Sequence, residues 1–330
     1  MLPVLTVTLN PSIDVTTSVD ALKPLQKLRC SKARLDPGGG GVNVSRAIKE
    51  LGGESQAFVA LGGDAGAQLR HLLEATGLRI DYWQLVSETR ISFTVLENST
   101  ALPYRFVLPG PVISPFEADE ILKRLEKLIG RYTGYVVASG SLPPGIPDDF
   151  YARLARKTRE LGGRFVIDTH GNPLRLATEE RPYLVRLNHL EAQELLGGGA
   201  DAAAYTLASE LVDRGLTEAA IVTIGERGAI VATPRGSLEI KPPKVAVKSG
   251  VGAGDSFVAA LVFGLANGWA LEDAARYGVA AAAAAVTTDA TELCKRETVE
   301  DFYAQISKAK GPLEQRQGAL APETTVSVPV

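Results

Sequence analysis

The chain has 330 residues, of which 45% are hydrophobic and 22% are charged, values that are ordinary for a globular protein with a substantial core. A net charge of −3 gives no global field that would recruit nucleic acid or an anionic membrane. Two distant cysteines, Cys30 and Cys294, argue against a disulfide framework, and we find no signal peptide and no strongly apolar run of about twenty residues. We therefore expect a cytoplasmic protein with no nucleic-acid partner and no membrane partner.

Strands and helices alternate along most of the chain. Short apolar strands are expected at residues 5–10, 57–63, 135–140, 164–169 and 219–225. Amphipathic helices are expected at residues 44–53, 65–77, 117–130, 148–162 and 202–215. Helices of this length between strands predict βαβ crossovers and a mainly parallel sheet in an α/β fold.

Two segments break this rhythm. Residues 89–107 contain two alternating runs around the polar turn NSTALP, which is a hairpin pattern. Residues 12–34 alternate between polar and apolar without a helical period. We assign these segments, at approximately residues 12–36 and 88–108, to a small separate sheet inserted in one domain that spans residues 1–310. Residues 311–330 are polar, proline-bearing and non-periodic, and we expect a flexible tail.

The stretch GVGAGDSF (residues 250–257) places one carboxylate behind three glycines, before an apolar run. Glycines let backbone N–H groups approach a ligand, and the unpaired donors at a helix start favour an anion. The carboxylate of Asp255 could then accept a hydroxyl proton while the amides hold the charge of a transferring phosphoryl group. An aspartate that merely caps a helix explains this motif equally well when it is taken alone.

Further motifs favour the functional interpretation. The run PGGGGVN (residues 37–43) costs conformational entropy and fits a backbone held against a polyhydroxylated ligand, with Asn43 as donor and acceptor. The stretch TIGERGA (residues 223–229) repeats the glycine turn after a strand. Asn188 and Glu191 could share a helix face as oxygen ligands of hydrated Mg²⁺, although a capping box has the same spacing.

In this order the four motifs resemble those of the PfkB sugar kinases of the ribokinase-like superfamily, over about residues 3–308. Within the family, LTVTLNPSID, KLRC, YRFVLPG and SGSLPPG are most similar to the minor bacterial 6-phosphofructokinases. The resemblance implies a three-layer α/β/α domain with a mainly parallel sheet and a small β-sheet lid that closes over the sugar. It also implies ATP and Mg²⁺ as cofactors and a homodimer formed through the lid, and it leaves activation by K⁺ open.

The resemblance assigns a role to each matching residue. Asp255 would be the base that deprotonates the sugar, and the amides of Gly252, Ala253 and Gly254 would form the anion hole. The sugar contacts would come from Asp14, Gly38, Gly39, Asn43 and Ser139, and the cations for its phosphate from Lys27, Arg29, Arg90 and Arg105. The nucleotide would be bound by Arg186, Asn188, Thr223, Gly225 and Gly228, and the metal by Glu191, Asn188 and Asp168. For each of these cations taken singly, a solvated surface residue is the simpler interpretation. For Asp168, a side chain that caps the end of a strand explains the residue as well as a role toward the metal does.

The implied activity is ATP-dependent phosphorylation of the C1 hydroxyl of fructose 6-phosphate to fructose 1,6-bisphosphate. Relatives that act on fructose 1-phosphate or tagatose 6-phosphate usually carry a lysine where this chain has Gly40, and an acidic pair where it has Tyr104 and Arg105. Kinases for those two sugars remain the nearest alternatives, and the cations argue against an unphosphorylated sugar. A non-catalytic sugar-phosphate sensor is the alternative from another class. The chain departs from its relatives at Gly250 and in residues 281–294, where nucleotide contacts are expected.

Overall fold

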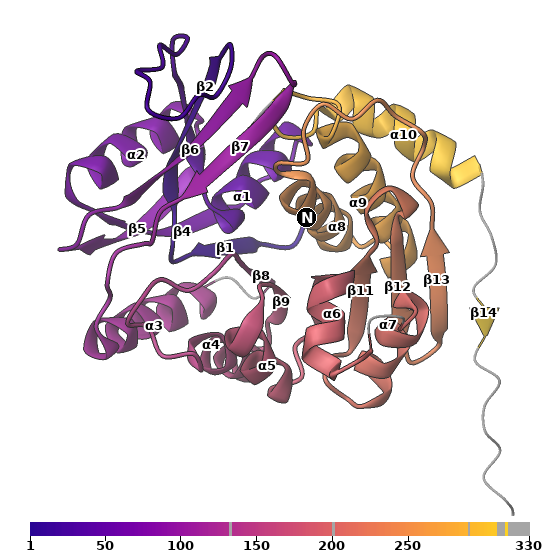
Figure 1. The fold of residues 1–330 in the computed structure, drawn as a ribbon. Coiled ribbons are helices and arrows are strands. Elements are labelled where there is room, and N and C mark those ends of the chain that lie inside the picture. Colours follow the sequence, from indigo (N-terminus) through magenta and orange to yellow (C-terminus); the bar gives the residue numbers. More distant parts are fainter. Residues whose placement is uncertain (132–133, 200–201, 290, 309–313, 316–330) are drawn as a thin grey trace, which may run out of the picture.

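The computed structural model of the chain describes residues 1–131, 134–199, 202–289, 291–308 and 314–315. The described residues form one ten-stranded sheet with helices on both faces, and a separate four-stranded sheet (Figure 1). The α/β/α class and the small second sheet, both predicted from the sequence, are confirmed.

The large sheet runs in the order β14-β13-β12-β11-β10-β9-β8-β1-β4-β5. Its strands are β1 (Val4–Thr8), β4 (Gln56–Gly62), β5 (Arg79–Leu85), β8 (Tyr135–Ser139), β9 (Arg164–Asp168), β10 (Leu184–Asn188), β11 (Ala219–Thr223), β12 (Ala229–Thr233), β13 (Gly236–Ile240) and β14 (Glu314–Gln315). The pairings from β5 through to β11 are parallel. Parallel strands leave all their carboxyl ends at one edge, and that edge is where ligands bind in such sheets.

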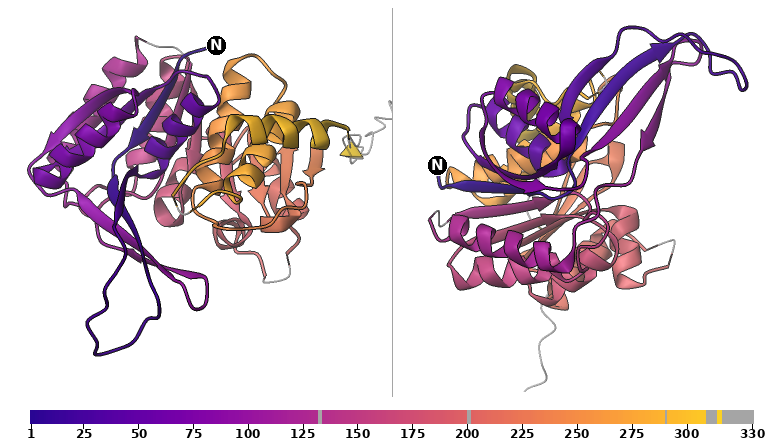
Figure 2. Two further views of the ribbon diagram at one scale, coloured as in Figure 1. Left: turned by 90° about the horizontal axis from the view of Figure 1, so that it is seen from above. Right: turned by 90° about the vertical axis from the view of Figure 1, so that its left-hand side faces the viewer.

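Both faces of the large sheet are covered by helices (Figure 2). One face carries α1 (Gly40–Glu50), α2 (Gly63–Ala75), α8 (Ala253–Ala266), α9 (Leu271–Ala285) and α10 (Arg296–Lys308). The other carries α3 (Pro115–Ile129), α4 (Phe150–Glu160), α5 (Gly171–Glu179), α6 (His189–Leu196) and α7 (Ala204–Asp213). Strand β8 is buried at every position because Val136 packs toward α3 and α4 while Val137 packs toward α1 and α8. Burial on both faces explains why such strands read as continuous apolar runs.

The edge beyond β11 differs from the predicted rhythm. Strands β12, β13 and β14 pair antiparallel, and no α-helix separates β11 from β12 or β12 from β13. The chain reverses through the short 3₁₀ helix η1 (Gly225–Arg227) and Gly228, whose φ is +98°. A Cβ at Gly228 would lie 2.0 Å from the carbonyl oxygen of Ile240, so packing against β13 alone demands glycine here.

The small sheet contains β3 (Arg34–Gly38), β2 (Ser12–Val19), β6 (Arg90–Glu97) and β7 (Leu102–Val107), in that order. Strands β6 and β7 form the predicted hairpin, and β2 pairs parallel with β6. Strand β2 begins four residues after β1 ends, so the small sheet projects from the carboxyl edge of the large one (Figure 2). It therefore stands beside the edge where a ligand is expected.

The predicted tail lies mostly outside the described residues. Glu314 and Gln315 pair with β13, and nothing further of residues 311–330 is described. Within the described ranges, no helix is both long enough and apolar enough to cross a bilayer.

Candidate active site

Four of the predicted site residues end adjacent strands of the large sheet. Ser139 at the end of β8 lies opposite Asp168 at the end of β9, and Asn188 of β10 lies opposite Thr223 of β11. Because these strands are parallel, the four side chains meet at one edge. The sheet register thus assembles a polar floor from positions spread over 85 residues of sequence, from 139 to 223.

Helix α8 begins over this floor. Gly252 is its N-cap with a left-handed φ of +75°, and the first backbone bond runs from Ser256 N to Gly252 O at 2.8 Å. The amides that precede Ser256 are therefore not used within the helix, and they add to the positive end of its dipole. Of Gly250, Gly252 and Gly254, Gly252 alone takes a positive φ.

Asp255 lies in the first turn of α8, where it accepts a hydrogen bond from Asn43 Nδ2 to Oδ2 at 2.9 Å. Burial raises the pKa of the Asp255 carboxyl from 3.8 to about 6, and the nearby charge of Asp168 adds to the rise. The Asn43 bond and the Arg186 guanidinium act in the opposite direction. A carboxyl with this pKa is mostly ionised at neutral pH and can accept a proton.

Arg186 supplies a cation beside the same helix start. Its Nη1 donates to Asp168 Oδ1 at 3.1 Å and its Nη2 donates to Thr223 Oγ1 at 2.9 Å. The buried Nε finds no hydrogen-bond partner among the described residues. A Cβ at Gly254 would lie 3.0 Å from Arg186 Nη1, so the guanidinium borders the first turn of α8. Amide donors and a cation thus converge on one place, which suits a phosphoryl group.

Asp14 and Arg90 lie where the small sheet joins the large one. Ser12 Oγ donates to Asp14 Oδ1 at 2.6 Å, and burial raises the pKa of the Asp14 carboxyl while Arg105, Arg90 and Arg46 oppose the rise. Arg90 donates from Nη2 to Asn10 O at 3.0 Å, and its buried Nε has no partner within the described chain. Burial also lowers the pKa of the Arg90 guanidinium, which the Asp14 carboxylate partly offsets.

The glycine run before α1 has a packing reason that the sequence did not reveal. Gly39 is the N-cap of α1 with φ +112°, and a Cβ at Gly38 would lie 2.3 Å from Asp14 Oδ2. A Cβ at Gly40 would lie 2.3 Å from Ser139 Oγ, and one at Gly41 would lie 2.7 Å from the carbonyl oxygen of Val7. The run therefore lets α1 approach residues of the site, and a ligand is not needed to explain four glycines.

Lys27 and Arg29 are not brought to the other predicted cations. Both are exposed in the loop between β2 and β3, which extends beyond the far end of the small sheet (Figure 2). Arg105 lies on β7 opposite Thr94 and is exposed, and it acts on Asp14 electrostatically. The resemblance assigned all four cations to one phosphate, whereas the structure places Lys27 and Arg29 in a loop apart from Arg90.

Asn188 and Glu191 form the capping box that was the alternative to a metal site. Glu191 N donates to Asn188 Oδ1 at 2.9 Å, and Asn188 N donates to Glu191 Oε2 at 2.7 Å. No cluster of three or more His, Cys, Asp or Glu side chains placed to hold a metal occurs within the described ranges. Carboxylate and amide oxygens can still hold the waters of a hydrated magnesium ion, so their role toward the metal stays a prediction.

The sequence did not single out three residues that the structure places in the site. Asn10 accepts the bond from Arg90 at its carbonyl, and Ser12 donates to Asp14. Arg46 Nη1 donates to Asn43 Oδ1 at 3.0 Å. The helical spacing of three between Asn43 and Arg46 was the available signal for the last pair.

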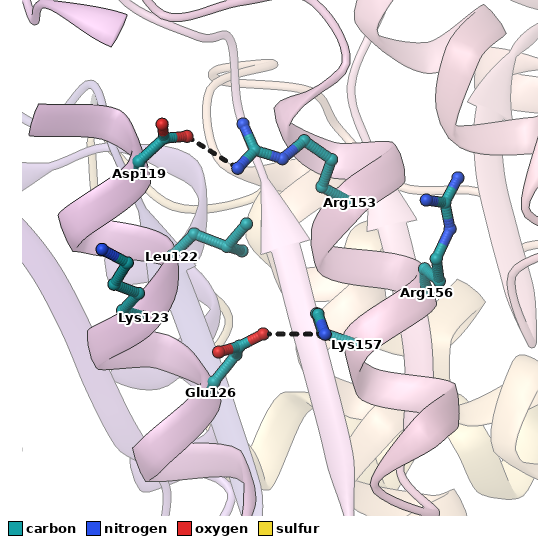
Figure 3. A pocket seen from close by; sticks show the side chains of 7 residues that line it. All are labelled: Asp119, Leu122, Lys123, Glu126, Arg153, Arg156 and Lys157. Carbon is teal, nitrogen blue, oxygen red and sulfur yellow. Dashed lines mark hydrogen bonds and ion pairs between the residues drawn. The ribbon is translucent and has the colours of Figure 1, made fainter. Parts of the chain in front are cut away.

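A groove on the outer surface, between α3 and α4, is a separate feature (Figure 3). It is lined by Asp119, Leu122, Lys123, Glu126, Arg153, Arg156 and Lys157. Arg153 pairs with Asp119 at 2.6 Å and Lys157 pairs with Glu126 at 3.2 Å. Cations that are already paired with carboxylates are poor anion receptors, so we do not assign this groove to the site.

A carboxylate, helix-start amides and an arginine meet at the carboxyl edge of a parallel sheet, beside a small second sheet, and this arrangement is typical of α/β enzymes that transfer phosphoryl groups. Residues 7–298 match the pfkB family of carbohydrate kinases, and the chain belongs to that family. It is thus an ATP-dependent sugar kinase with a ribokinase-like fold.

Curated relatives and solved structures agree with this assignment. The chain is 40% identical over 302 residues to ATP-dependent 6-phosphofructokinase isozyme 2 of Mycobacterium tuberculosis, covering 91% of this chain and 88% of that protein. It is 31% identical to a 1-phosphofructokinase of Bacillus subtilis, covering 91% of this chain and 97% of that protein. The crystal structure of phosphofructokinase-2 from Escherichia coli in complex with potassium superposes with a TM-score of 0.88 at 33% identity, covering 93% of this chain and all of that one.

Proposed function

We propose that this kinase transfers the γ-phosphoryl group of ATP to the C1 hydroxyl of fructose 6-phosphate. The observation that carries the proposal is Asp255, a carboxylate of raised pKa in the first turn of α8, next to unused amides and Arg186. The relative with 40% identity, named as a 6-phosphofructokinase, supports the choice of sugar. The cations Arg90 and Arg105, both acting on Asp14, support a substrate that already carries a phosphate.

The residues divide the reaction between them. Asp255 accepts the proton of the C1 hydroxyl, and the freed oxygen forms a bond to the γ-phosphorus as the bond to the β-phosphate oxygen breaks. The amides of Ala253 and Gly254 and the guanidinium of Arg186 stabilise the charge on the transferred group. Products are fructose 1,6-bisphosphate and ADP, and the proton stays on Asp255 until solvent removes it.

The chain offers suitable groups for ATP with Mg²⁺. The unpartnered Nε of buried Arg186 is a donor of the kind that phosphate oxygens accept, and Thr223 Oγ1, which accepts from Arg186 Nη2, helps to hold that guanidinium in place. Asn188 and Glu191 would hold the metal through its waters, and Mg²⁺ would supply charge neutralisation between the phosphates. Gly225 has a φ of +61° and nothing lies within 4 Å of its Cβ position, which leaves room for a nucleotide there.

The small sheet would act as a lid and as a dimer interface. Register places Leu35, Val15, Phe93 and Phe106 in one cross-strand row, on the face opposite to Asp14. Leu35, Phe93 and Phe106 are each at least 37% exposed. An apolar row of this kind on a projecting sheet suits burial against the same sheet of a second copy.

Two alternatives remain. A kinase for fructose 1-phosphate or tagatose 6-phosphate would keep Asp255 and the fold, and 1-phosphofructokinases are among the relatives. A sugar-phosphate sensor would need no base, and the environment of Asp255 argues against it.

The test is ADP formation with fructose 6-phosphate, fructose 1-phosphate, tagatose 6-phosphate, fructose and ribose at equal concentrations. We expect a clear lead in kcat/KM for fructose 6-phosphate. A lead for another sugar would overturn the substrate assignment but keep the kinase. No turnover with any of them, despite calorimetric binding of a sugar phosphate, would favour the sensor.

A further inference from the structure

Arg46 contacts Asn43, which in turn contacts the proposed base, Asp255. It sits on α1, three residues after Asn43, and its Nη1 donates to Asn43 Oδ1 and to Pro37 O, each at 3.0 Å. Asn43 in turn donates from Nδ2 to Asp255 Oδ2 at 2.9 Å. A continuous chain of hydrogen bonds thus runs from Arg46 through Asn43 to Asp255.

The chemistry of Arg46 and of Asp255 determines the orientation of the Asn43 amide that lies between them. A carboxamide has a donor nitrogen and an acceptor oxygen, and either could face a neighbour. Arginine has donors only, so Arg46 requires the Asn43 oxygen on its own side. The nitrogen must then face Asp255, which is the orientation in which Asn43 can donate to an ionised carboxylate. Without Arg46, the amide could rotate and present its oxygen to Asp255, which would repel the charge.

The surrounding charges strengthen this role. Arg46 is attracted by Asp36, Asp14 and Asp255, while burial lowers the pKa of its guanidinium. Asp255 is faced by Asp168 from β9, Arg186 from β10, Asp14 from β2 and Asn43 from α1. Two of these four groups are carboxylates that oppose its ionisation, so the loss of one donor has a large effect.

Resting on the proposed function of Asp255 as the base, we propose that Arg46 is a positioning residue that orients the Asn43 amide and thereby holds Asp255 ready to accept the sugar proton. The competing explanation is that Arg46 only fastens α1 to β3 through Pro37 O. That explanation predicts a loss of stability with no specific effect on the proton-transfer step.

The experiment compares Arg46→Met, Arg46→Lys and Asn43→Ala, singly and as the double variant Arg46→Met with Asn43→Ala. Lys49→Met is the matched control, because Lys49 lies one turn further along α1 and also donates to two backbone carbonyls, those of Thr76 and Gly77. For each variant kcat and KM are measured separately, together with the pH profile of kcat/KM and the thermal midpoint.

We expect Arg46→Met to lower kcat about 10- to 100-fold, the effect of losing a hydrogen bond to a charged group, with a smaller change in sugar KM. The acidic limb of its pH profile should move to higher pH, and Arg46→Lys should recover part of both effects because lysine can still donate to Asn43. In the Asn43→Ala background, Arg46→Met should cost little more, since its route to Asp255 is already gone. Lys49→Met should leave kcat and the pH profile as in the wild type.

Two results would overturn the inference. One is an equal fold-loss from Arg46→Met with and without Asn43, which would mean that Arg46 acts by another route. The other is a lowered thermal midpoint with unchanged kcat and pH profile, which would make Arg46 a structural fastener. Asp255→Asn, assayed alongside, separates the two proposals: full turnover in that variant would refute the base itself, whereas its inactivity with a silent Arg46→Met would refute the role of Arg46 alone.

Discussion

Asn43 and Asp255 are separated by 212 positions in the sequence, yet Asn43 Nδ2 lies 2.9 Å from Asp255 Oδ2. This bond joins the glycine run that starts α1 to the glycine turn that starts α8. Two helix starts therefore meet over the end of the sheet, and the Asp255 carboxylate lies between them. The following expectations derive from that arrangement.

The first concerns pH. In the enzyme without substrate, the pKa of Asp255 is raised to about 6. Because a base must be ionised to accept a proton, kcat/KM should fall as pH drops through about 6 and stay level above it. A sugar phosphate titrates in the same range, so the position of the limb alone is ambiguous. Asn43→Ala resolves this, because the Asn43 bond lowers the Asp255 pKa. The limb should move to higher pH in the variant, and an unmoved limb would assign it to the substrate.

The second concerns stability. A carboxyl whose pKa is higher in the folded state than in the unfolded state opposes folding once it is ionised, so the penalty grows between about pH 4 and 6 and is complete above. Asp255→Asn removes this penalty. We expect the free energy of unfolding to gain about 1–2 kcal/mol more from this substitution at pH 8 than at pH 4.5, after allowance for partial solvent exposure. Urea unfolding at both pH values measures it, and a pH-independent difference would contradict the raised pKa.

The third concerns the sugar phosphate. Arg90→Ala should raise KM for fructose 6-phosphate about 10- to 100-fold, because a charge-assisted bond to phosphate is lost, and should change KM for ATP little. Arg79 is a suitable control, since it lies on β5 and pairs with Glu54 at 3.0 Å, away from the site. Steady-state kinetics with each substrate varied separately are sufficient. An equal rise in KM for both substrates would mean that Arg90 does not bind the phosphate of the sugar.

The fourth concerns the glycine run. Gly40→Ala would place a Cβ 2.3 Å from Ser139 Oγ and 2.8 Å from the backbone of Ser139, so α1 must shift. We expect a loss of about 1–3 kcal/mol in stability together with a lower kcat/KM. Gly199→Ala is the control because nothing lies within 4 Å of its Cβ position. Wild-type behaviour of Gly40→Ala would show that the approach of α1 to β8 is not needed for the site.

The fifth concerns assembly. The double substitution Phe93→Ser with Phe106→Ser removes two adjacent members of the apolar row on the small sheet. If the row is the dimer interface, light scattering should show a dimer for the wild type and a monomer for the variant. The control substitution Val86→Ser also replaces an apolar side chain by serine, at a residue that is 96% exposed and outside the row, and it should leave the dimer intact. A dimer that persists in the double variant would place the interface elsewhere.

Much of the fold could be predicted because both faces of a parallel sheet are buried. A strand that is buried on both faces needs apolar residues at consecutive positions, as in residues 135–139, and amphipathic helices separate such strands. The antiparallel edge from β12 to β14 was not predicted. The tight reversal at Gly228 depends on its contact with Ile240, and Ile240 lies outside the turn motif at residues 223–229. Local pattern does not contain such a contact.

The site divides in the same way. Asp255 and the start of α8 were visible because helix starts have a local signature in glycine and acid spacing. Arg46 and Ser12 were not identified, although their partners Asn43 and Asp14 lie only three and two positions away, because spacing alone does not show which polar side chains turn toward one another. Arg90 lies opposite Ser12 at the start of β2, whereas Lys27 lies in the loop beyond the end of β2, and composition does not reveal that separation. The capping box at Asn188 shows that one spacing serves two purposes until the geometry is known.

The central claim is that Asp255 is the base of phosphoryl transfer to the sugar, and Asp255→Asn tests it most directly. Turnover of fructose 6-phosphate should fall about 10²- to 10⁴-fold, the usual contribution of a general base, while calorimetric binding of fructose 6-phosphate stays near that of the wild type. Wild-type turnover in this variant would contradict the account.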